Sequence, residues 1–167
     1  IDGEPTIDML GVEPRRYGSY ATKSYLKAKN EEAYANVFTV HYPDEEREAG
    51  RPLRQAPCYD RLKKLGAVFG SKFGWERANF FATEGEKPED DWSFRRSKWF
   101  KNVEKECKNV KENVGLLDMT AFGKCRIKGP GAEEFLDKLV ANKLPKKIGR
   151  INLCHALNTK GGVHSEF

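Results

Sequence analysis

Residues 149–167 read GRINLCHALNTKGGVHSEF. Residues 149–157 alternate between apolar and polar side chains, which predicts a strand with two different faces. Residues 158–162 combine Asn, Thr and two glycines, a composition typical of a hairpin turn. Val163 then begins a return strand. The stretch therefore predicts an antiparallel pair of strands.

Upstream of this pair, helical and strand-like segments alternate. The spacing of apolar residues predicts a helix over 132–140, with two glutamates in its first turn, where the helix dipole favours them. A turn at 129–131 precedes it, and residues 116–117 and 124–127 suggest short strands. The order helix, strand, helix, strand, turn, strand predicts an α+β domain that continues past residue 167.

The clearest periodicity in the chain predicts an amphipathic helix over 98–113, which Gly115 ends. Lysines and glutamates flank its apolar positions and are expected to face solvent. Four side chains form the predicted buried face: Trp99, Val103, Cys107 and Val110.

The first half of the chain is interrupted more often by Pro and Gly. We expect a helix over 19–37 with Thr22 near its start, a loop-rich passage over 38–57 and a short helix over 59–65. Residues 83–91 make the best linker candidate. The apolar positions of the first helix are Tyr25, Leu26, Ala33, Tyr34 and Val37.

The composition is that of a globular protein, since 38% of the 167 residues are hydrophobic and 33% are charged. No run approaches the roughly 18 apolar residues that span a bilayer. Acidic residues interrupt the basic ones, so the net charge of +5 indicates a solvated surface. The cysteines form no CxxC pair, and we expect buried free thiols in a reducing compartment and no metal site. They are Cys58, Cys107, Cys125 and Cys154.

Glu166 is the most suggestive candidate for chemistry. It follows the glycine pair at 161–162 by four residues, and a carboxylate at such a place can hold or deprotonate an amine. The alternative is an exposed glutamate on a surface hairpin. His155 shares a predicted strand face with Leu153, and a histidine on an apolar face is usually a core residue, with a cofactor role as the alternative.

Two further segments leave their role open. Phe122 lies in a turn over 118–123, where it can cover a ligand or pack in the core. Residues 92–99 interleave aromatic and basic side chains, which can stack on nucleic acid bases or can anchor a linker to its domain. We favour the anchored linker.

The two ends of the chain resemble cuts. The N-terminus has no initiator Met and no signal peptide, and the C-terminus stops within an apolar/polar alternation. We therefore expect an internal fragment of a longer protein.

A series of short motifs runs in order along nearly the whole chain. The motifs of the first half are Arg16-Tyr17-Gly18, Tyr42-Pro43, Ala49-Gly50-Arg51-Pro52 and Gly74-Trp75-Glu76-Arg77; those of the second are Val114-Gly115-Leu116-Leu117-Asp118, Phe122-Gly123-Lys124, Ala141-Asn142 and Gly161-Gly162-Val163. With these motifs, the first half resembles the segment that leaves the FAD-dependent oxidase module in the dimethylglycine/sarcosine dehydrogenase family. The second half is similar to the opening of the aminomethyltransferase (glycine cleavage T-protein) fold.

The resemblance implies three segments: the tail of an FAD oxidoreductase module over 1–55, a connecting segment over 56–97, and the truncated N-terminal part of a folate-binding domain over 98–167. It implies a flavoenzyme that demethylates dimethylglycine or sarcosine with FAD and passes the one-carbon unit to tetrahydrofolate. The chain alone is then expected to be inactive. Glu166 matches the position of the family's catalytic carboxylate, normally Asp. The residues expected at the folate pocket are Phe122, Leu153 and His155.

Two other classes of function stay open. One is a non-catalytic T-protein-like scaffold or regulatory protein, and the other is a basic nucleic-acid-binding module, which the interrupted charge pattern disfavours. Under the enzyme hypothesis the partners are an N-methyl glycine and folate, with no nucleic acid and no membrane. The compartment is then the cytoplasm in a bacterium or the mitochondrial matrix in a eukaryote.

Overall fold

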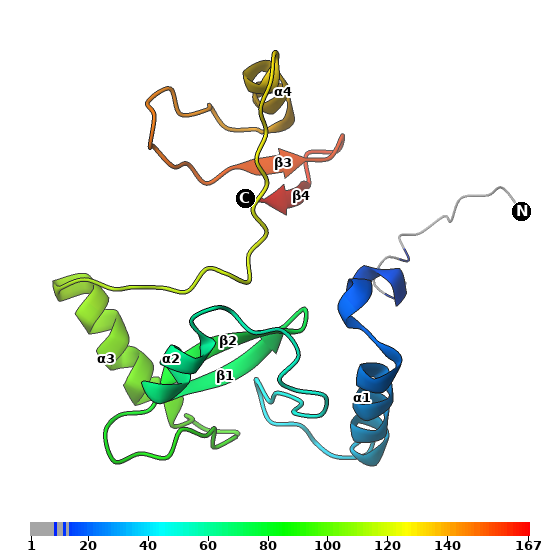
Figure 1. Cartoon of the computed structure of the whole chain (residues 1–167), viewed down its shortest axis with the longest axis vertical. Coiled ribbons are helices and arrows are strands. Elements are labelled where there is room, and N and C mark those ends of the chain that lie inside the picture. The colour runs from blue at the N-terminus through cyan, green and yellow to red at the C-terminus, as the bar shows by residue number, and fades with distance from the viewer. Residues whose placement is uncertain (1–8, 10–11, 13) are drawn as a thin grey trace, which may run out of the picture. The chain divides into compact units, whose positions relative to one another are not determined.

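Figure 1 shows the computed structural model, which describes residues 9, 12 and 14–167. The chain divides into two compact units, residues 1–123 and residues 124–167. Within the residues described, each unit contains one antiparallel two-stranded sheet. The mixture of helices and strands confirms the predicted α+β class.

The first unit is built around a hairpin of β1 (Ala67–Lys72) and β2 (Trp75–Phe81). Its two turn residues, Phe73 and Gly74, have positive φ angles of 49° and 79°. Positive φ at both turn positions gives a twist that matches paired strands. No element was predicted from the sequence over residues 67–82, so this hairpin was missed.

Helices flank this hairpin on two sides. α2 (Tyr59–Lys64) contacts β1, and α3 (Trp99–Glu112) contacts β2 (Figure 1). Both helices were predicted within two residues at each end. The fully buried Phe80, at 2% exposure, lies on β2 and marks the small apolar core of this unit.

The predicted buried face of α3 is wrong in its C-terminal half. Trp99 and Val103 are half-buried, but Cys107 is exposed and Val110 is 53% exposed. The most buried residue of the helix is Asn102, whose amide donates to the Glu86 carboxylate at 3.1 Å. Every residue of the helix from Cys107 to Glu112 is exposed, so its packed side ends at Glu106, whose carboxylate accepts the Phe81 amide at 2.9 Å.

The helix predicted over 19–37 is α1 (Lys23–Ala35), after a 3-10 helix at Pro14–Tyr20. Thr22 is its N-cap, and the Thr22 hydroxyl accepts a hydrogen bond from the Tyr25 amide at 3.3 Å. The predicted apolar face is wrong at Tyr34, which is 83% exposed. The packed face instead contains Glu32, whose carboxylate accepts the amides of Glu48 and Ala49, both at 2.8 Å.

Residues 42–52 cross from α1 to the hairpin without regular structure and are held by charged groups. Arg51 and Glu76 form a buried ion pair, with Nη2 to Oε2 at 2.7 Å, and Arg51 also donates to the Phe69 carbonyl at 2.8 Å. The hydrogen bond to Glu76 raises the pKa of the Arg51 guanidinium, although burial opposes the rise. Glu46 accepts the Ser71 amide at 2.9 Å.

The second unit contains α4 (Ala132–Leu139), β3 (His155–Leu157) and β4 (Val163–Glu166). The helix, the hairpin turn and the return strand are confirmed. β3 is shorter than the predicted strand over 149–157, and Cys154, just before it, exchanges backbone hydrogen bonds with Phe167. The strands suggested at 116–117 and 124–127 do not form, and Leu116 is fully exposed.

Candidate functional site

The turn between β3 and β4 depends on the glycine pair. Asn158 Oδ1 accepts the amides of Lys160 and Gly162, each at 2.9 Å, which closes the turn from inside. Gly161 has a φ of 80°, a conformation that costs other residues about 1–2 kcal/mol. A Cβ added at Gly162 would lie 2.9 Å from the Asn158 amide nitrogen. The turn therefore favours glycine at 161 through its backbone conformation, and a side chain at 162 would displace the Asn158 side chain.

The strand register brings two of the predicted site residues together. His155 and Glu166 are cross-strand Cα partners, and His155 Nε2 lies 3.3 Å from Glu166 Oε2. The imidazole is the more buried of the two, since 34% of the His155 side chain and 57% of the Glu166 side chain are exposed. A half-buried imidazole thus lies beside an exposed carboxylate.

Hydrogen bonds on the edge of β3 that faces away from β4 fix the backbone of His155. Asn142 Oδ1 accepts the His155 amide at 3.0 Å, and the Ala141 amide donates to the His155 carbonyl at 2.8 Å. In the sequence, Asn142 was noted only as part of a family motif, and its hydrogen bond to the His155 backbone was not predicted. A side-chain amide just after a helix is the signal that could have suggested it, because Asn often binds neighbouring backbone groups.

The predicted alternation of the strand is confirmed, but the face that contains Cys154 is the buried one, and the face of His155 is not. Cys154 and Ala156 are buried at 7% and 8% exposure, whereas Leu153 and Leu157, on the face of His155, are 63% and 46% exposed. The interpretation of His155 as an ordinary core histidine is therefore wrong. Its face is open, and the carboxylate has apolar neighbours along the strand.

The other two predicted pocket residues are placed separately. Leu153 precedes His155 by two residues and has an exposed side chain. Phe122 belongs to the first unit, where the Arg77 guanidinium lies 5.3 Å from the centre of its ring. Phe122 remains about half exposed. The structure brings together Glu166 and His155 and leaves Phe122 in a different unit.

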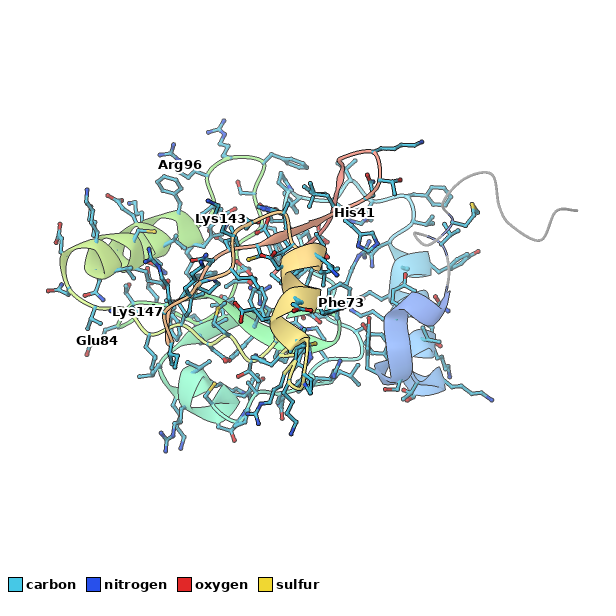
Figure 2. The ribbon with its side chains drawn as sticks, turned by 90° about the horizontal axis from the view of Figure 1, so that it is seen from above. His41, Phe73, Glu84, Arg96, Lys143 and Lys147 are labelled. Atoms are coloured by element: carbon cyan, nitrogen blue, oxygen red, sulfur yellow. The ribbon has the colours of Figure 1, made fainter. Side chains whose placement is uncertain are left out.

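The loop between α4 and β3 gives the second unit exposed positive charge. Figure 2 labels Lys143 and Lys147 on this loop, and both side chains are exposed. The Lys143 carbonyl accepts a hydrogen bond from the Asn152 amide at 3.0 Å, which ties the two ends of the loop together. A basic surface favours anionic partners.

The first unit has a hollow of opposite character. Its volume is about 380 Å³, and it is lined by two indole rings, other apolar side chains and three carboxylates. Burial, Asp91 and Glu46 raise the pKa of the Asp90 carboxyl. Negative charge makes this hollow unsuitable for an anionic cofactor such as a folate or the phosphates of a flavin nucleotide. The residues that line it are Asp44, Glu46, Asn79, Phe80, Asp90, Trp92, Trp99 and Val103.

The cysteines are free, but the expectation that they are buried is wrong for two of them. Cys107 and Cys125 are exposed, and only Cys154 is fully buried. A hydrogen bond to Asp118 and burial raise the pKa of the Cys58 thiol, which lowers its reactivity. Among the described residues, no group of three or more His, Cys, Asp and Glu side chains has the arrangement of a metal site. None of the helices described is long and apolar enough to cross a membrane.

Two family models match the chain in the order that the sequence predicted. The FAD dependent oxidoreductase central domain matches residues 2–56, and the GCVT N-terminal domain matches residues 58–167. The boundary between them falls in the first unit, between Arg51 and the hairpin that contains Glu76.

Several curated proteins are similar to the chain over nearly its whole length. Mitochondrial dimethylglycine dehydrogenase of Rattus norvegicus is 38% identical over 167 residues, all of this chain and 19% of that protein. The formaldehyde-forming 4-methylaminobutanoate oxidase of Paenarthrobacter nicotinovorans is 33% identical over 98% of the chain and 20% of that protein. The mitochondrial pyruvate dehydrogenase phosphatase regulatory subunit of Mus musculus is 31% identical over 99% of the chain and 20% of that protein. The chain thus spans about a fifth of the length of these relatives.

Proposed function

Since the chain belongs to the family of the GCVT N-terminal domain, preceded by an FAD dependent oxidoreductase central domain, we propose that it is part of a flavoenzyme of one-carbon metabolism. The substrate is an N-methyl glycine, dimethylglycine or sarcosine. We keep the predicted division into an oxidoreductase tail over 1–55, a connecting segment over 56–97 and a folate-binding part over 98–167. The chain alone is inactive in this proposal.

The proposed reaction has two halves. FAD, when bound, would supply the two-electron oxidation of the N-methyl group, which would leave the substrate as an iminium. Tetrahydrofolate, when bound, would supply two amine nitrogens that accept the methylene carbon. The demethylated amine would leave with the two protons that these nitrogens release, so atoms and charge balance.

The role proposed for Glu166 is to hold positive charge and move a proton at the reacting amine. An ionised carboxylate close to a cationic iminium stabilises it, and the same group can relay a proton to the departing nitrogen. The observation that carries this role is the exposed Glu166 carboxylate, 3.3 Å from the imidazole of His155 on the open face of the hairpin.

The surroundings of Glu166 fit part of a folate site. Leu153 and Leu157 lie on the same open strand face and offer apolar surface to a flat ring. The same unit contains the basic loop at 143–150, which favours an anionic ligand such as the carboxylates of a folate. Phe122 is kept as a proposed pocket residue. FAD is proposed to bind other parts of the full-length protein, because the chain contains no glycine-rich GxGxxG phosphate loop.

A non-catalytic scaffold is the second candidate function. It is favoured by the similarity to a phosphatase regulatory subunit of Mus musculus, at 31% identity. The nucleic-acid hypothesis has less support, because the indole rings of Trp92 and Trp99 are half-buried against the acidic hollow of the first unit. We propose the mitochondrial matrix as its compartment if the source is a eukaryote and the cytoplasm if it is a bacterium.

The substitution Glu166→Gln in the full-length protein tests the enzyme proposal. It removes the charge and keeps the shape, so it should slow methylene-tetrahydrofolate formation by about 10²-fold, the usual scale for one acid–base group. Flavin reduction by substrate should remain nearly unchanged. Stopped-flow flavin bleaching and chromatography of the folate product measure the two halves separately.

Glu133→Gln is the matched control, since Glu133 is an exposed glutamate in the first turn of α4 in the same unit. It should leave both halves at the wild-type rate. If Glu166→Gln forms folate product as fast as this control, Glu166 is a surface residue without a catalytic role. A full-length protein with no flavin reduction by any N-methyl glycine would support the scaffold instead.

A further inference from the structure

The position of His155 in the strand register determines how closely it approaches Glu166. Cys154 and Phe167 exchange both backbone hydrogen bonds, at 2.8 and 3.0 Å. In an antiparallel pair, hydrogen-bonded and non-hydrogen-bonded pairs alternate, so the adjacent pair, His155 and Glu166, is non-hydrogen-bonded. Side chains are closest in such pairs and extend from the same face of the sheet.

The chemistry of the two groups fixes the direction of their contact. An ionised carboxylate only accepts hydrogen bonds, so the Nε2 atom of His155 must carry the hydrogen that bridges the 3.3 Å to Glu166 Oε2. Both the neutral Nε2–H tautomer and the imidazolium can donate this bond. Holding the carboxylate therefore does not require His155 to be charged.

The two residues differ in how firmly they are fixed. The backbone of His155 is held by the Asn142 side chain and the Ala141 amide, and its ring is the more buried partner. Glu166 has a longer side chain, and most of its surface is open to solvent. If the fixed His155 ring orders the Glu166 side chain before the substrate reacts, less conformational entropy is lost during the reaction itself.

We propose that His155 is a positioning residue, whose imidazole holds the Glu166 carboxylate in its reactive orientation, and that it does not itself bind the folate. This inference rests on the role proposed above for Glu166. It replaces the expectation that His155 is a cofactor-binding residue. The Asn142–His155–Glu166 series then links the end of α4 to the reactive carboxylate through one cross-strand pair.

The test uses the full-length protein with His155→Ala, His155→Gln and Glu166→Gln as single variants, and with His155→Ala and Glu166→Gln combined in one double variant. The kcat of folate product formation and the KM for tetrahydrofolate are measured separately, with flavin reduction as a check on folding. His155→Ala should lower kcat by about 10-fold with KM within about 2-fold of wild type, because a misplaced group loses rate rather than affinity. His155→Gln retains an N–H donor and should restore most of kcat.

The double variant separates positioning from independent action. If His155 acts only through Glu166, the double variant should be no slower than Glu166→Gln alone. His164→Ala, which removes an exposed imidazole from the same hairpin, should have the wild-type kcat and KM.

The possible failures are distinguishable. A wild-type rate for Glu166→Gln overturns the proposed function, whatever His155 does. A slow Glu166→Gln with an unaffected His155→Ala leaves the function standing and overturns the positioning role. A raised KM with unchanged kcat in His155→Ala also overturns positioning and makes His155 a folate-binding residue.

Discussion

Arg51 and Glu76 make the most consequential residue-scale contact of the first unit. Only 12% of the Arg51 side chain and 3% of the Glu76 side chain are exposed. Arg51→Ala leaves a buried carboxylate without its cation, and such losses typically cost about 3–5 kcal/mol. We expect a decrease of this size in the free energy of unfolding, measured by urea denaturation.

Lys87→Ala is the control, because Lys87 and Glu89 form an ion pair of similar length, 2.6 Å, whose side chains are 77% and 53% exposed. Exposed pairs contribute about 0–1 kcal/mol. If both substitutions decrease the free energy of unfolding by the same amount, the buried Arg51–Glu76 pair stabilises the fold no more than an exposed ion pair does.

Glu86 predicts a specific response to acid. Hydrogen bonds from the Thr83 hydroxyl, the Thr83 amide and the Asn102 side-chain amide lower the pKa of Glu86 from its ordinary value of 4.5 to about 2. A group with a depressed folded-state pKa stabilises the fold above its unfolded-state pKa and loses that contribution as pH falls towards the folded-state pKa. Glu86→Gln should lower the melting temperature at pH 7, and its difference from wild type should shrink between about pH 5 and pH 2. A constant difference across this range would contradict the assignment.

The sequence predicts the candidate residues of the site but not the contact between them. Glu166 and His155 could both be selected as candidates, because a glycine pair and strand alternation are local signals. Their contact could not be predicted, because it depends on a bulge. Leu157 pairs with Val163 and Ala156 with Ser165, so His164 is skipped and the register shifts by one residue. An unbulged hairpin would place Ser165 opposite His155.

At the scale of elements, α3 predicts different effects for two substitutions of the same kind. Val103 is half-buried and lines the hollow that contains Glu46 and Asp90, whereas Val110 is 53% exposed. Val103→Asp should lower the free energy of unfolding by about 2–3 kcal/mol, because it adds an unpaired charge among like charges. Val110→Asp should change it by less than about 0.5 kcal/mol. Urea denaturation of both variants measures the difference, and equal losses would mean that the predicted face is buried along its whole length.

Helices were predicted better than strands for a physical reason. The Thr22 cap and the apolar periods of α3 and α4 are local patterns within single segments. The β1–β2 hairpin escaped prediction because Glu76 interrupts the expected pattern with a charge, which is buried only because Arg51 neutralises it from 25 residues away along the chain. The suggested strand at 124–127 had the right residue types but does not form in the described structure.

For the whole chain, the two units should differ in stability. The hairpin of the first unit contains Ala67, Val68 and Phe80 at 6% exposure or less, whereas every residue of β4 in the second unit is exposed. Regions with few buried contacts open at lower free energy. In hydrogen exchange of the 167-residue chain with increasing urea, amides of 155–166 should lose protection before amides of 67–81. Simultaneous loss would show that the units unfold as one.

The overall order of domains was predictable, but the grouping of residues into units was not. Motifs along the chain indicated an oxidoreductase segment followed by a folate-type domain, and the family matches over 2–56 and 58–167 have this order. Sequence similarity follows ancestry, however, whereas compactness follows contacts. The contacts of Glu46 and Arg51 place the end of the first family segment in the same unit as the start of the second.

The Arg51–Glu76 pair has a consequence for recombination between relatives. A chimaera made by joining two homologous proteins at the family boundary near residue 57 would take the guanidinium from one parent and the carboxylate from the other. Any parent that lacks either group would leave its counterpart buried without compensation. Crossover points placed before residue 42 or after residue 82 would inherit the pair, and the Glu46–Ser71 bond with it, from a single ancestor. The segments that can be exchanged between relatives therefore begin and end at other residues than the family boundary near residue 57.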